Sequence, residues 1–318
     1  MLLLPTLSKC ANRGIPAKVH PTSGSPEDWL SNKLLLKSGL FGISLDFFVD
    51  WSAGSGILGQ VVWIKRILPE GFIYQDVCED LHRIMMEDIG REYLNRICGF
   101  ASIFGFNIEI VIVRDDYNWS EPSSSILLIE VKRSLDGDFH FKNSVLTIAE
   151  FKSEIQKLSG GPVHVGPKGL TYGTSRLECF LSGTDSAYPG DVDLIIIGSD
   201  NLPHAIIEFK KHSKDSPMKD QKLSNYYPNP DARKYDRLAL LRDFVSRTPN
   251  QVPIIIIYFP TGAGTKEGSL ELIQGPVGKL NTAAVQNFNL PSKKEESAFE
   301  PIVKIILKAI DNHKRSWS

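Results

Sequence analysis

The chain has 318 residues, of which 42% are hydrophobic and 23% are charged, and its 36 Lys and Arg nearly balance its 37 Asp and Glu. This composition is typical of a globular protein and excludes a collagen, a coiled coil, a disulfide mini-protein and a disordered tail. The length favours two domains, and the net charge of −1 argues against a protein that coats nucleic acid or a membrane through bulk charge alone.

The four cysteines are far apart, with no CxxC pair and no histidine at metal-ligand spacing. They are Cys10, Cys78, Cys98 and Cys179. We therefore expect neither a zinc site nor a disulfide framework, and we expect a reducing, cytoplasmic setting. The apolar opening of the chain lacks a basic flank and is too short for a signal peptide. No stretch approaches the about 18 apolar residues of a membrane span, so we expect no membrane partner.

Apolar spacing in the first half predicts both strands and helices. In chain order it predicts short strands over 40–64, a helix over 74–97, strands over 108–113 and 125–132, and a helix over 144–158. The pattern breaks at Asp136-Gly137-Asp138, which places a domain boundary between 134 and 143. We expect an N-terminal α+β domain over 1–139 that recognises substrate or partner, and a catalytic domain over 140–318.

The second half predicts an α/β core with a mixed sheet. Its expected elements are a strand over 176–181, an antiparallel pair over 192–197 and 205–209, a helix over 231–246, a strand over 252–259 and a closing helix around 302–310. The run over 252–259 is almost unbroken in apolar residues, which is typical of a strand covered on both faces. This order of elements is typical of helices packed on a sheet.

The predicted hairpin carries carboxylates and a lysine. Strand side chains alternate between faces, so Asp191 shares a face with Asp193, and Glu208 shares a face with Lys210. A turn near residue 201 would bring Asp193 opposite residue 209 or 210. One or two carboxylates suffice to bind Mg²⁺ beside a substrate phosphate, and a lysine can orient or deprotonate the attacking water. The grouping predicts phosphodiester hydrolysis.

At these residues the sequence resembles the PD-(D/E)xK nuclease superfamily. The resemblance rests on Asp193 and on Glu208-x-Lys210 fifteen positions later, and it extends in pattern over about 144–259. It implies a restriction-endonuclease-like fold, a mixed sheet flanked by helices, with Asp193 and Glu208 as ligands of Mg²⁺ or Mn²⁺ and Lys210 as the catalytic lysine. The implied activity is cleavage of nucleic acid, with DNA expected and RNA left open.

Two ligand assignments stay open. Asp191 is a rival for the aspartate role, because the motif proline at 189 is followed by glycine rather than directly by aspartate. Many members of the superfamily also place a glutamate on the first core helix, and either Glu150 or Glu154 would fill that place.

A weaker copy of the pattern lies earlier in the chain. Glu109 stands where Asp193 would be, and Glu130-x-Lys132 follows as a second acidic-x-lysine triplet. This copy is either a diverged internal duplicate with a second site or a pair of strands that obey the same alternation rule. If one site is active, the later one has the more usual aspartate.

Basic residues gather between 203 and 245, where nine Lys and Arg face six Asp and Glu. The candidate phosphate-binding residues are Lys211, Lys214, Arg233, Lys234 and Arg237. Tyr226, Tyr227 and Tyr235 are interleaved with them and could stack on bases. The alternative is a lysine-rich loop that only keeps the chain in solution.

Two functions from different classes follow. The first is a metal-dependent nuclease, and pairing of two copies would let it cut both strands of DNA. The second is a nuclease-like fold without catalysis, which binds nucleic acid or protein.

Overall fold

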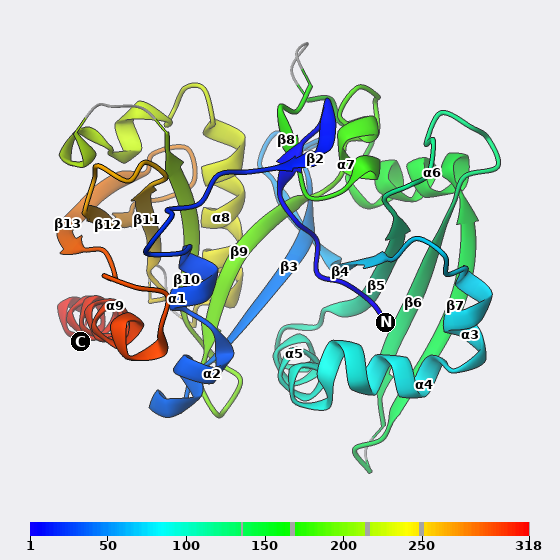
Figure 1. Cartoon of the computed structure of the whole chain (residues 1–318), viewed down its shortest axis with the longest axis horizontal. Coiled ribbons are helices and arrows are strands. Elements are labelled where there is room, and N and C mark those ends of the chain that lie inside the picture. The colour runs from blue at the N-terminus through cyan, green and yellow to red at the C-terminus, as the bar shows by residue number, and fades with distance from the viewer. Residues whose placement is uncertain (135, 166–168, 214–216, 248–250, 318) are drawn as a thin grey trace. The chain divides into compact units, whose positions relative to one another are not determined.

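The computed structural model describes residues 1–134, 136–165, 169–213, 217–247 and 251–317 (Figure 1). The chain is a mixed α/β protein. Its contacts divide it into two units: unit 1 consists of residues 1–17 and 45–191, and unit 2 consists of residues 18–44 and 192–318. The boundary expected between 134 and 143 therefore falls inside unit 1, and an N-terminal segment joins the unit formed by the second half.

Five consecutive strands of unit 1 lie side by side in chain order. They are β3 (Phe41–Asp50), which begins in unit 2, β4 (Ile57–Leu68), β5 (Asn107–Arg114), β6 (Ser125–Arg133) and β7 (Phe139–Thr147). The β4–β5 pair is parallel, whereas β3–β4, β5–β6 and β6–β7 are antiparallel. A smaller sheet joins three short strands, β2 (Asn12–Pro16), β1 (Ser8–Lys9) and β8 (Tyr172–Gly173).

Helices of unit 1 provide the crossover between its parallel strands and pack against the sheet. The crossover contains α3 (Tyr74–Glu79), α4 (Leu81–Ile84), the π-helical η2 (Met85–Gly90) and α5 (Arg91–Phe104). The helix predicted over 74–97 is thus confirmed but interrupted. Two later helices, α6 (Ile148–Leu158) and α7 (Arg176–Leu181), share a core with Trp63, whose ring stacks on Phe151 with centroids 4.9 Å apart.

The strand predicted over 176–181 is wrong, because this segment is helix α7. The side chain of Ser175 caps it by accepting a hydrogen bond from the amide of Glu178 at 3.1 Å. Leu177 and Leu181 are four residues apart and both fully buried, which is helical spacing. The helix predicted from residue 144 begins only at 148, because 144–147 complete β7.

Five strands of unit 2 also lie in consecutive order. They are β9 (Gly190–Ile197), which begins in unit 1, β10 (Pro203–His212), β11 (Ile254–Pro260), β12 (Glu267–Gln274) and β13 (Asn281–Asn289). The β10–β11 pair is parallel and joined through α8 (Ala232–Val245), and the other pairs are antiparallel. The predicted antiparallel pair, the helix after it and the buried strand are all confirmed, and every residue of β11 is buried.

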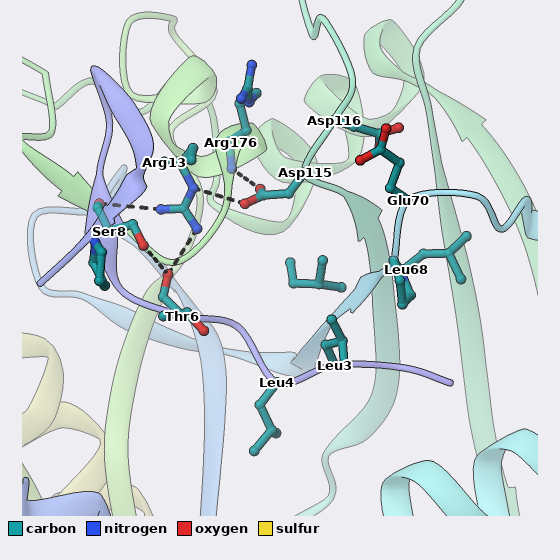
Figure 2. A pocket seen from close by; sticks show the side chains of 13 residues that line it. Leu3, Leu4, Thr6, Ser8, Arg13, Leu68, Glu70, Asp115, Asp116 and Arg176 are labelled. Atoms are coloured by element: carbon teal, nitrogen blue, oxygen red, sulfur yellow. Dashed lines mark hydrogen bonds and ion pairs between the residues drawn. The ribbon is translucent and has the colours of Figure 1, made fainter.

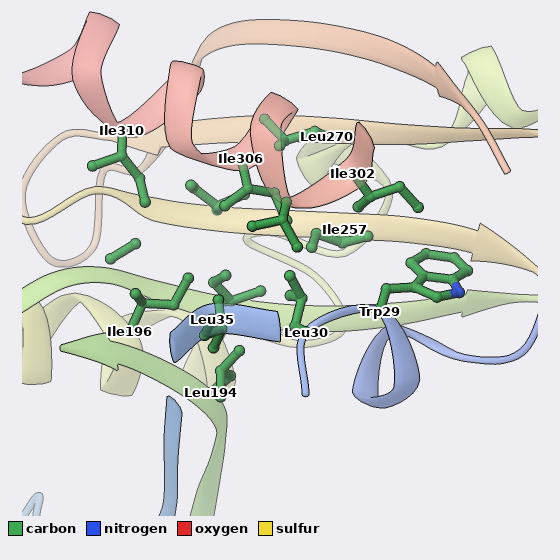
Figure 3. Packing of buried hydrophobic residues seen from close by; sticks show 14 of the residues in the cluster. Trp29, Leu30, Leu35, Leu194, Ile196, Ile257, Leu270, Ile302, Ile306 and Ile310 are labelled. Atoms are coloured by element: carbon green, nitrogen blue, oxygen red, sulfur yellow. The ribbon is translucent and has the colours of Figure 1, made fainter. Parts of the chain in front are cut away.

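The core of unit 2 lies between its sheet and helices from both ends of the chain. The helices are α1 (Pro26–Trp29), α2 (Asn32–Leu35) and α9 (Glu296–Trp317); a short 3₁₀ turn, η1 (Leu36–Ser38), follows α2. Figure 3 shows Ile302, Ile306 and Ile310 of α9, spaced by four residues, pointing at the sheet from one side. Trp29 joins this cluster edge-on to Phe259, with ring centroids 6.0 Å apart. Two 3₁₀ turns, η3 (Met218–Asp220) and η4 (Leu223–Asn225), precede α8.

The two units use the same order of strand pairings. In each, an antiparallel pair is followed by a helical crossover to a parallel strand, and two antiparallel strands complete the series. The β3–β4 pair therefore corresponds to β9–β10, and β5–β6 corresponds to β11–β12. The weaker motif copy with Glu109 and Glu130 lies on β5 and β6, so it is not the counterpart of the hairpin with Asp193.

The expectation of no disulfide is wrong. Cys10 and Cys179 form one within unit 1, with Cα atoms 5.4 Å apart and a separation of 169 positions in the sequence. Pairing of β1 with β8 brings the two segments together, because Cys10 follows β1 and Cys179 lies on α7, just after β8. Cys78 and Cys98 are free thiols.

Candidate functional site

The β9–β10 hairpin aligns the predicted aspartate with the predicted glutamate. Leu194 pairs with Ile207, so continuing the ladder by one step brings Asp193 opposite Glu208. The prediction of residue 209 or 210 is wrong, because the pairs of the ladder are centred near residue 200 rather than on residue 201: Pro203 pairs with Ile197, and Ala205 pairs with Ile196. Asn201 in this turn adopts a φ of 60°, a conformation that asparagine tolerates better than most residues.

The two faces of β10 have different neighbours in unit 2. Ala205 and Ile207 belong to the apolar cluster beneath α9. Glu208 and Lys210 form ion pairs with side chains at the start of α8. Alternation along the strand thus puts both residues of the Glu-x-Lys triplet on the α8 face, as predicted.

Asp193 lies against the backbone of β10. Its carboxylate accepts a hydrogen bond from the amide of Phe209 at 2.6 Å, and its own carbonyl accepts one from the hydroxyl of Ser44 at 2.6 Å. Asp193 is also close enough to Lys211 to affect it: burial lowers the pKa of Lys211, and Glu27 and Asp193 oppose that change. One oxygen of Asp193 is therefore committed to the residue between Glu208 and Lys210.

Glu208 is fully buried, and its carboxylate is poorly satisfied. Neither oxygen has a hydrogen-bond partner. The ammonium of Lys234 on α8 lies 2.5 Å from Oε1, as an ion pair without hydrogen-bond geometry. Burying a charge is costly unless it is both paired and hydrogen-bonded, so this carboxylate, although paired with one ammonium, lacks the hydrogen bonds that would offset its burial.

Lys210 is enclosed by three side chains. Its ammonium lies 2.8 Å from the carboxylate of Asp231. It also lies over two rings, 4.5 Å from the centroid of Tyr226 and 5.6 Å from that of Tyr235. These contacts hold the ammonium by charge and by cation–π attraction on the face that also carries Glu208.

A second buried carboxylate in unit 2 shows what full satisfaction looks like. Glu271 on β12 accepts hydrogen bonds from the amide of Leu223 and the hydroxyl of Tyr258, each at 2.7 Å, and from the hydroxyl of Thr282. Three donors thus offset the cost of burying Glu271, whereas Glu208 has no hydrogen-bond donor. Glu208 is therefore the exception, because buried polar atoms normally have hydrogen-bond partners.

Another unsatisfied polar atom lies near Glu208. The hydroxyl of Tyr235 is buried and has no hydrogen-bond partner. Burial raises the pKa of Tyr235, and the charge of Glu208 raises it further. Oxygen ligands without donors are what a hard divalent cation takes, so Glu208, with Asp193 on the facing strand, fits Mg²⁺ or Mn²⁺. Among the residues that the structure describes, however, no three His, Cys, Asp or Glu side chains group closely enough to hold a metal ion by themselves.

The rival ligands lie in unit 1, where each has other contacts. Burial raises the pKa of Asp46, and the charge of Asp191 raises it further. Glu154 on α6 pairs with Lys157, and its charge adds to the effect of burial, which raises the pKa of Glu109. Glu150 completes the capping box of α6, where its carboxylate accepts hydrogen bonds from the amide and the hydroxyl of the N-cap residue Thr147.

The predicted phosphate-binding residues have different surroundings. Lys211 is half-buried, Arg233 is exposed, and Lys234 pairs with Glu208. Arg237 is half-buried on α8, and Lys214 lies outside the described residues. Of the three tyrosines, Tyr235 is fully buried and Tyr227 nearly so, and neither offers a ring face to a base. The prediction that these two residues, Tyr227 and Tyr235, stack on bases is therefore wrong.

The predicted second site does not repeat the arrangement of the first. Glu109 lies directly across from Glu130 on the neighbouring strand, and Lys132 pairs with Glu130. The indole of Trp63 donates a hydrogen bond to Glu109 at 2.7 Å, and burial raises the pKa of this carboxyl. The contacts describe a structural role for Glu109 in the core of unit 1.

The counterpart of the site in unit 1 is the face of β3 and β4 that meets the crossover helices. Arg66 lies on that face, with its guanidinium 5.9 Å from the ring centroid of Tyr93 on α5. The same face carries Phe47, which pairs with Val62. It carries no carboxylate on either of these two strands, both of which are fully described. The acidic site belongs to unit 2.

The sequence reading missed a buried charge group on the opposite face of β3 and β4. Asp46 and Lys65 are each 8% exposed, and the ammonium of Lys65 lies 3.2 Å from Glu178 and 3.9 Å from the ring centroid of Tyr188. Burial raises the pKa of Asp46 to about 7, although Lys65 opposes the change. Burial lowers the pKa of Lys65, and Glu178 and Asp46 outweigh it. The sequence signal for this group is a charged residue inside an otherwise apolar strand, Asp46 in β3 and Lys65 in β4.

A cavity of about 630 Å³ opens beside the N-terminal segment of unit 1 (Figure 2). Arg13 closes one side of it, donating to Asp115 at 2.9 Å and to the carbonyls of Ser8 and Thr6 at 3.3 and 2.9 Å. Exposed Leu4 lies on the other side. The contacts of Arg13 tie the N-terminal hairpin to the rest of unit 1, which is a structural role.

Comparison with protein-family models, with curated proteins and with solved structures finds no match for this chain. Within the described residues, no helix combines the length and the apolar character that crossing a membrane requires.

Proposed function

We propose that this protein is a divalent-metal-dependent nuclease with a restriction-endonuclease-like core in unit 2. The observation that carries the proposal is Glu208: a fully buried carboxylate, without a hydrogen bond to either oxygen, two residues before a lysine on the same strand face. Asp193 stands opposite it on the neighbouring strand. A divalent cation would satisfy these carboxylate oxygens, which no hydrogen-bond donor reaches in Glu208.

The order of elements supports the same proposal. An antiparallel hairpin carries the aspartate on one strand and the Glu-x-Lys triplet on the other, and a helix then leads to a parallel, fully buried strand. This is the pattern that the resemblance to PD-(D/E)xK nucleases implies. Because unit 1 has no carboxylate on the corresponding face of β3 and β4, we assign one site to the chain.

The roles follow from the positions of the side chains. Glu208 and Asp193 would hold Mg²⁺ or Mn²⁺, which supplies an activated water and charge neutralisation at the phosphate. Lys210, held beside Glu208 by Asp231 and two tyrosine rings, would orient the water. Lys211 lies at the next position of the strand, near Asp193, and would contact a phosphate oxygen.

Cleavage assays test the proposal. Purified protein is incubated with plasmid DNA, single-stranded DNA and RNA, each with Mg²⁺, with Mn²⁺ and with EDTA. We expect cutting of DNA that EDTA abolishes and that Glu208→Gln or Lys210→Ala lowers by about 100-fold or more. Asp193→Asn should behave in the same way, whereas Asp191→Asn and Glu154→Gln should retain cutting, because Asp191 interacts with Asp46 and Glu154 pairs with Lys157.

Failure to cut any of the three substrates with either metal would refute the proposal. Cutting that depends on Asp191 and not on Asp193 would show that the aspartate is wrongly assigned. Circular dichroism of each variant controls for loss of the fold.

A second candidate function is a nucleic-acid-binding module with this fold but without catalysis. Two ion pairs favour it: Asp231 neutralises Lys210, and Lys234 neutralises Glu208, so the charged side chains of the site are already paired with each other. It predicts binding of DNA or RNA that is unchanged by EDTA and by Glu208→Gln. Gel-shift titrations with and without EDTA separate it from the nuclease.

A further inference from the structure

Two charged residues at the start of α8 are placed against the local preferences of a helix. Lys234 lies in the first turn, where the helix dipole disfavours a cation. Asp231 stands at the N-cap, yet its side chain makes no capping hydrogen bond and instead pairs with Lys210. Both side chains therefore serve contacts to β10 rather than the helix itself.

The two partners of the Glu208–Lys234 ion pair differ in exposure. The Glu208 side chain is 0% exposed, whereas that of Lys234 is 29% exposed. The carboxylate is held on a central strand by its short side chain, whereas a lysine has a long, flexible stem and can carry its ammonium into solvent. Of the two charges, only the ammonium is able to leave.

The contact between them is weakly directional. The Lys234 nitrogen lies 2.5 Å from Oε1 of Glu208 but does not meet hydrogen-bond geometry, and Oε2 has no partner of any kind among the hydrogen bonds of the described residues. The nearby hydroxyl of Tyr235 is also buried without a partner. An ion that takes several oxygen ligands would satisfy these atoms better than one ammonium does.

We propose that Lys234 is the resident counter-ion of Glu208 and that a divalent cation competes with its ammonium for this carboxylate. The proposal rests on the proposed function, because the competing divalent cation is the one that the proposed nuclease binds. The two cations repel each other at short range and the buried carboxylate is shared, so binding of one displaces the other.

The exchange has a consequence for substrate binding. Lys234 keeps Glu208 neutralised while no metal is bound, and this lowers the apparent affinity for the metal. When the metal arrives, the displaced ammonium remains on the exposed side of α8, where it can bind a phosphate of the nucleic acid. Lys234 is thus a positioning residue for the metal and a phosphate ligand afterwards.

The experiment measures Mn²⁺ binding by isothermal titration calorimetry, and melting temperature with and without Mn²⁺, for the whole chain. The variant is Lys234→Met, and the matched control is Lys222→Met, which removes one exposed lysine from the segment before α8. Without metal, Lys234→Met should melt about 5–10 °C below wild type, because Glu208 loses its counter-ion. Mn²⁺ should restore the loss and should bind this variant about tenfold more tightly than it binds wild type or the control.

A second variant keeps the test decisive if Lys234→Met does not fold. Lys234→Gln supplies a neutral donor to Glu208, and it should also bind Mn²⁺ more tightly than wild type. Equal dissociation constants for Mn²⁺ in wild type and the folded Lys234 variants would overturn the competition and leave the proposed nuclease standing. Absence of Mn²⁺ binding in all folded proteins would instead refute the metal site, and with it both proposals.

Discussion

Asp46 makes the stability of unit 1 depend on pH in an unusual direction. Its side chain is buried on β3, opposite Trp63, and burial raises its pKa from 3.8 to about 7 in spite of the nearby Lys65. Between these two pH values the folded chain keeps a proton on Asp46 that the unfolded chain has lost. Stability from this group therefore falls as pH rises through that window, the opposite of the behaviour of a salt-bridged aspartate.

The size of the effect follows from the pKa. A rise from 3.8 to about 7 corresponds to a cost of at most about 4 kcal/mol once Asp46 is ionised in both states, at about 1.4 kcal/mol per pH unit. Asp46→Asn keeps the shape of the side chain and removes the charge. The variant should match wild type near pH 4 and exceed its free energy of unfolding by up to about 4 kcal/mol at pH 8.5.

Urea unfolding at pH 4, 5.5, 7 and 8.5 measures this difference, and hydrogen exchange of the β3 and β4 amides confirms that it arises in unit 1. Asp50→Asn is the matched control, because Asp50 lies on the same strand and hydrogen bonds from Ser52 lower its pKa. Asp46→Asn that is less stable than wild type at pH 8.5 would refute the reasoning. That result would mean that the attraction to Lys65 outweighs the cost of burial.

Two further predictions concern stability. The disulfide joins cysteines 169 positions apart, so Cys10→Ser with Cys179→Ser, or addition of dithiothreitol, should lower the free energy of unfolding by about 2–5 kcal/mol in urea titrations. An unchanged midpoint would show that the bond is not formed in solution. Ile306 of α9 is 1% exposed in the core of unit 2, so Ile306→Ala should cost about 2–5 kcal/mol by the same method, whereas Lys304→Ala on the exposed side of the helix should change it by less than about 0.5 kcal/mol.

Much of unit 2 was predictable because its signals are local. The hairpin of β9 and β10 and the buried strand β11 follow from alternating or continuous apolar residues, and α8 follows from helical spacing. In unit 1, segment 176–181 was misjudged because a run of only six residues with apolar side chains at 177, 180 and 181 fits a strand as well as a helix. The capping hydroxyl of Ser175 was the signal that decides between them.

The register of the hairpin shows where local reasoning ends. Symmetry about a turn near residue 201 placed Asp193 opposite residue 209 or 210, but the pairs of the ladder are centred near residue 200, which brings Asp193 opposite Glu208. The exact centre of a turn depends on how the turn and the neighbouring strands fit together, which alternation does not encode. The shared face of Glu208 and Lys210 was predicted correctly, whereas the partner of Asp193 across the ladder was not.

The sequence by itself determined which side chains share a strand face: Glu208 lies with Lys210 because strand geometry repeats every two residues. Only the tertiary structure decided that Lys234 reaches Glu208, that Asp231 reaches Lys210, and that Cys10 meets Cys179. Contacts of this second kind join residues that are far apart in the chain, and packing of helices on the sheet sets their distances. The structure also decided that residues 18–44 belong to unit 2, because α1 and α2 bury their apolar side chains against α9 and its sheet.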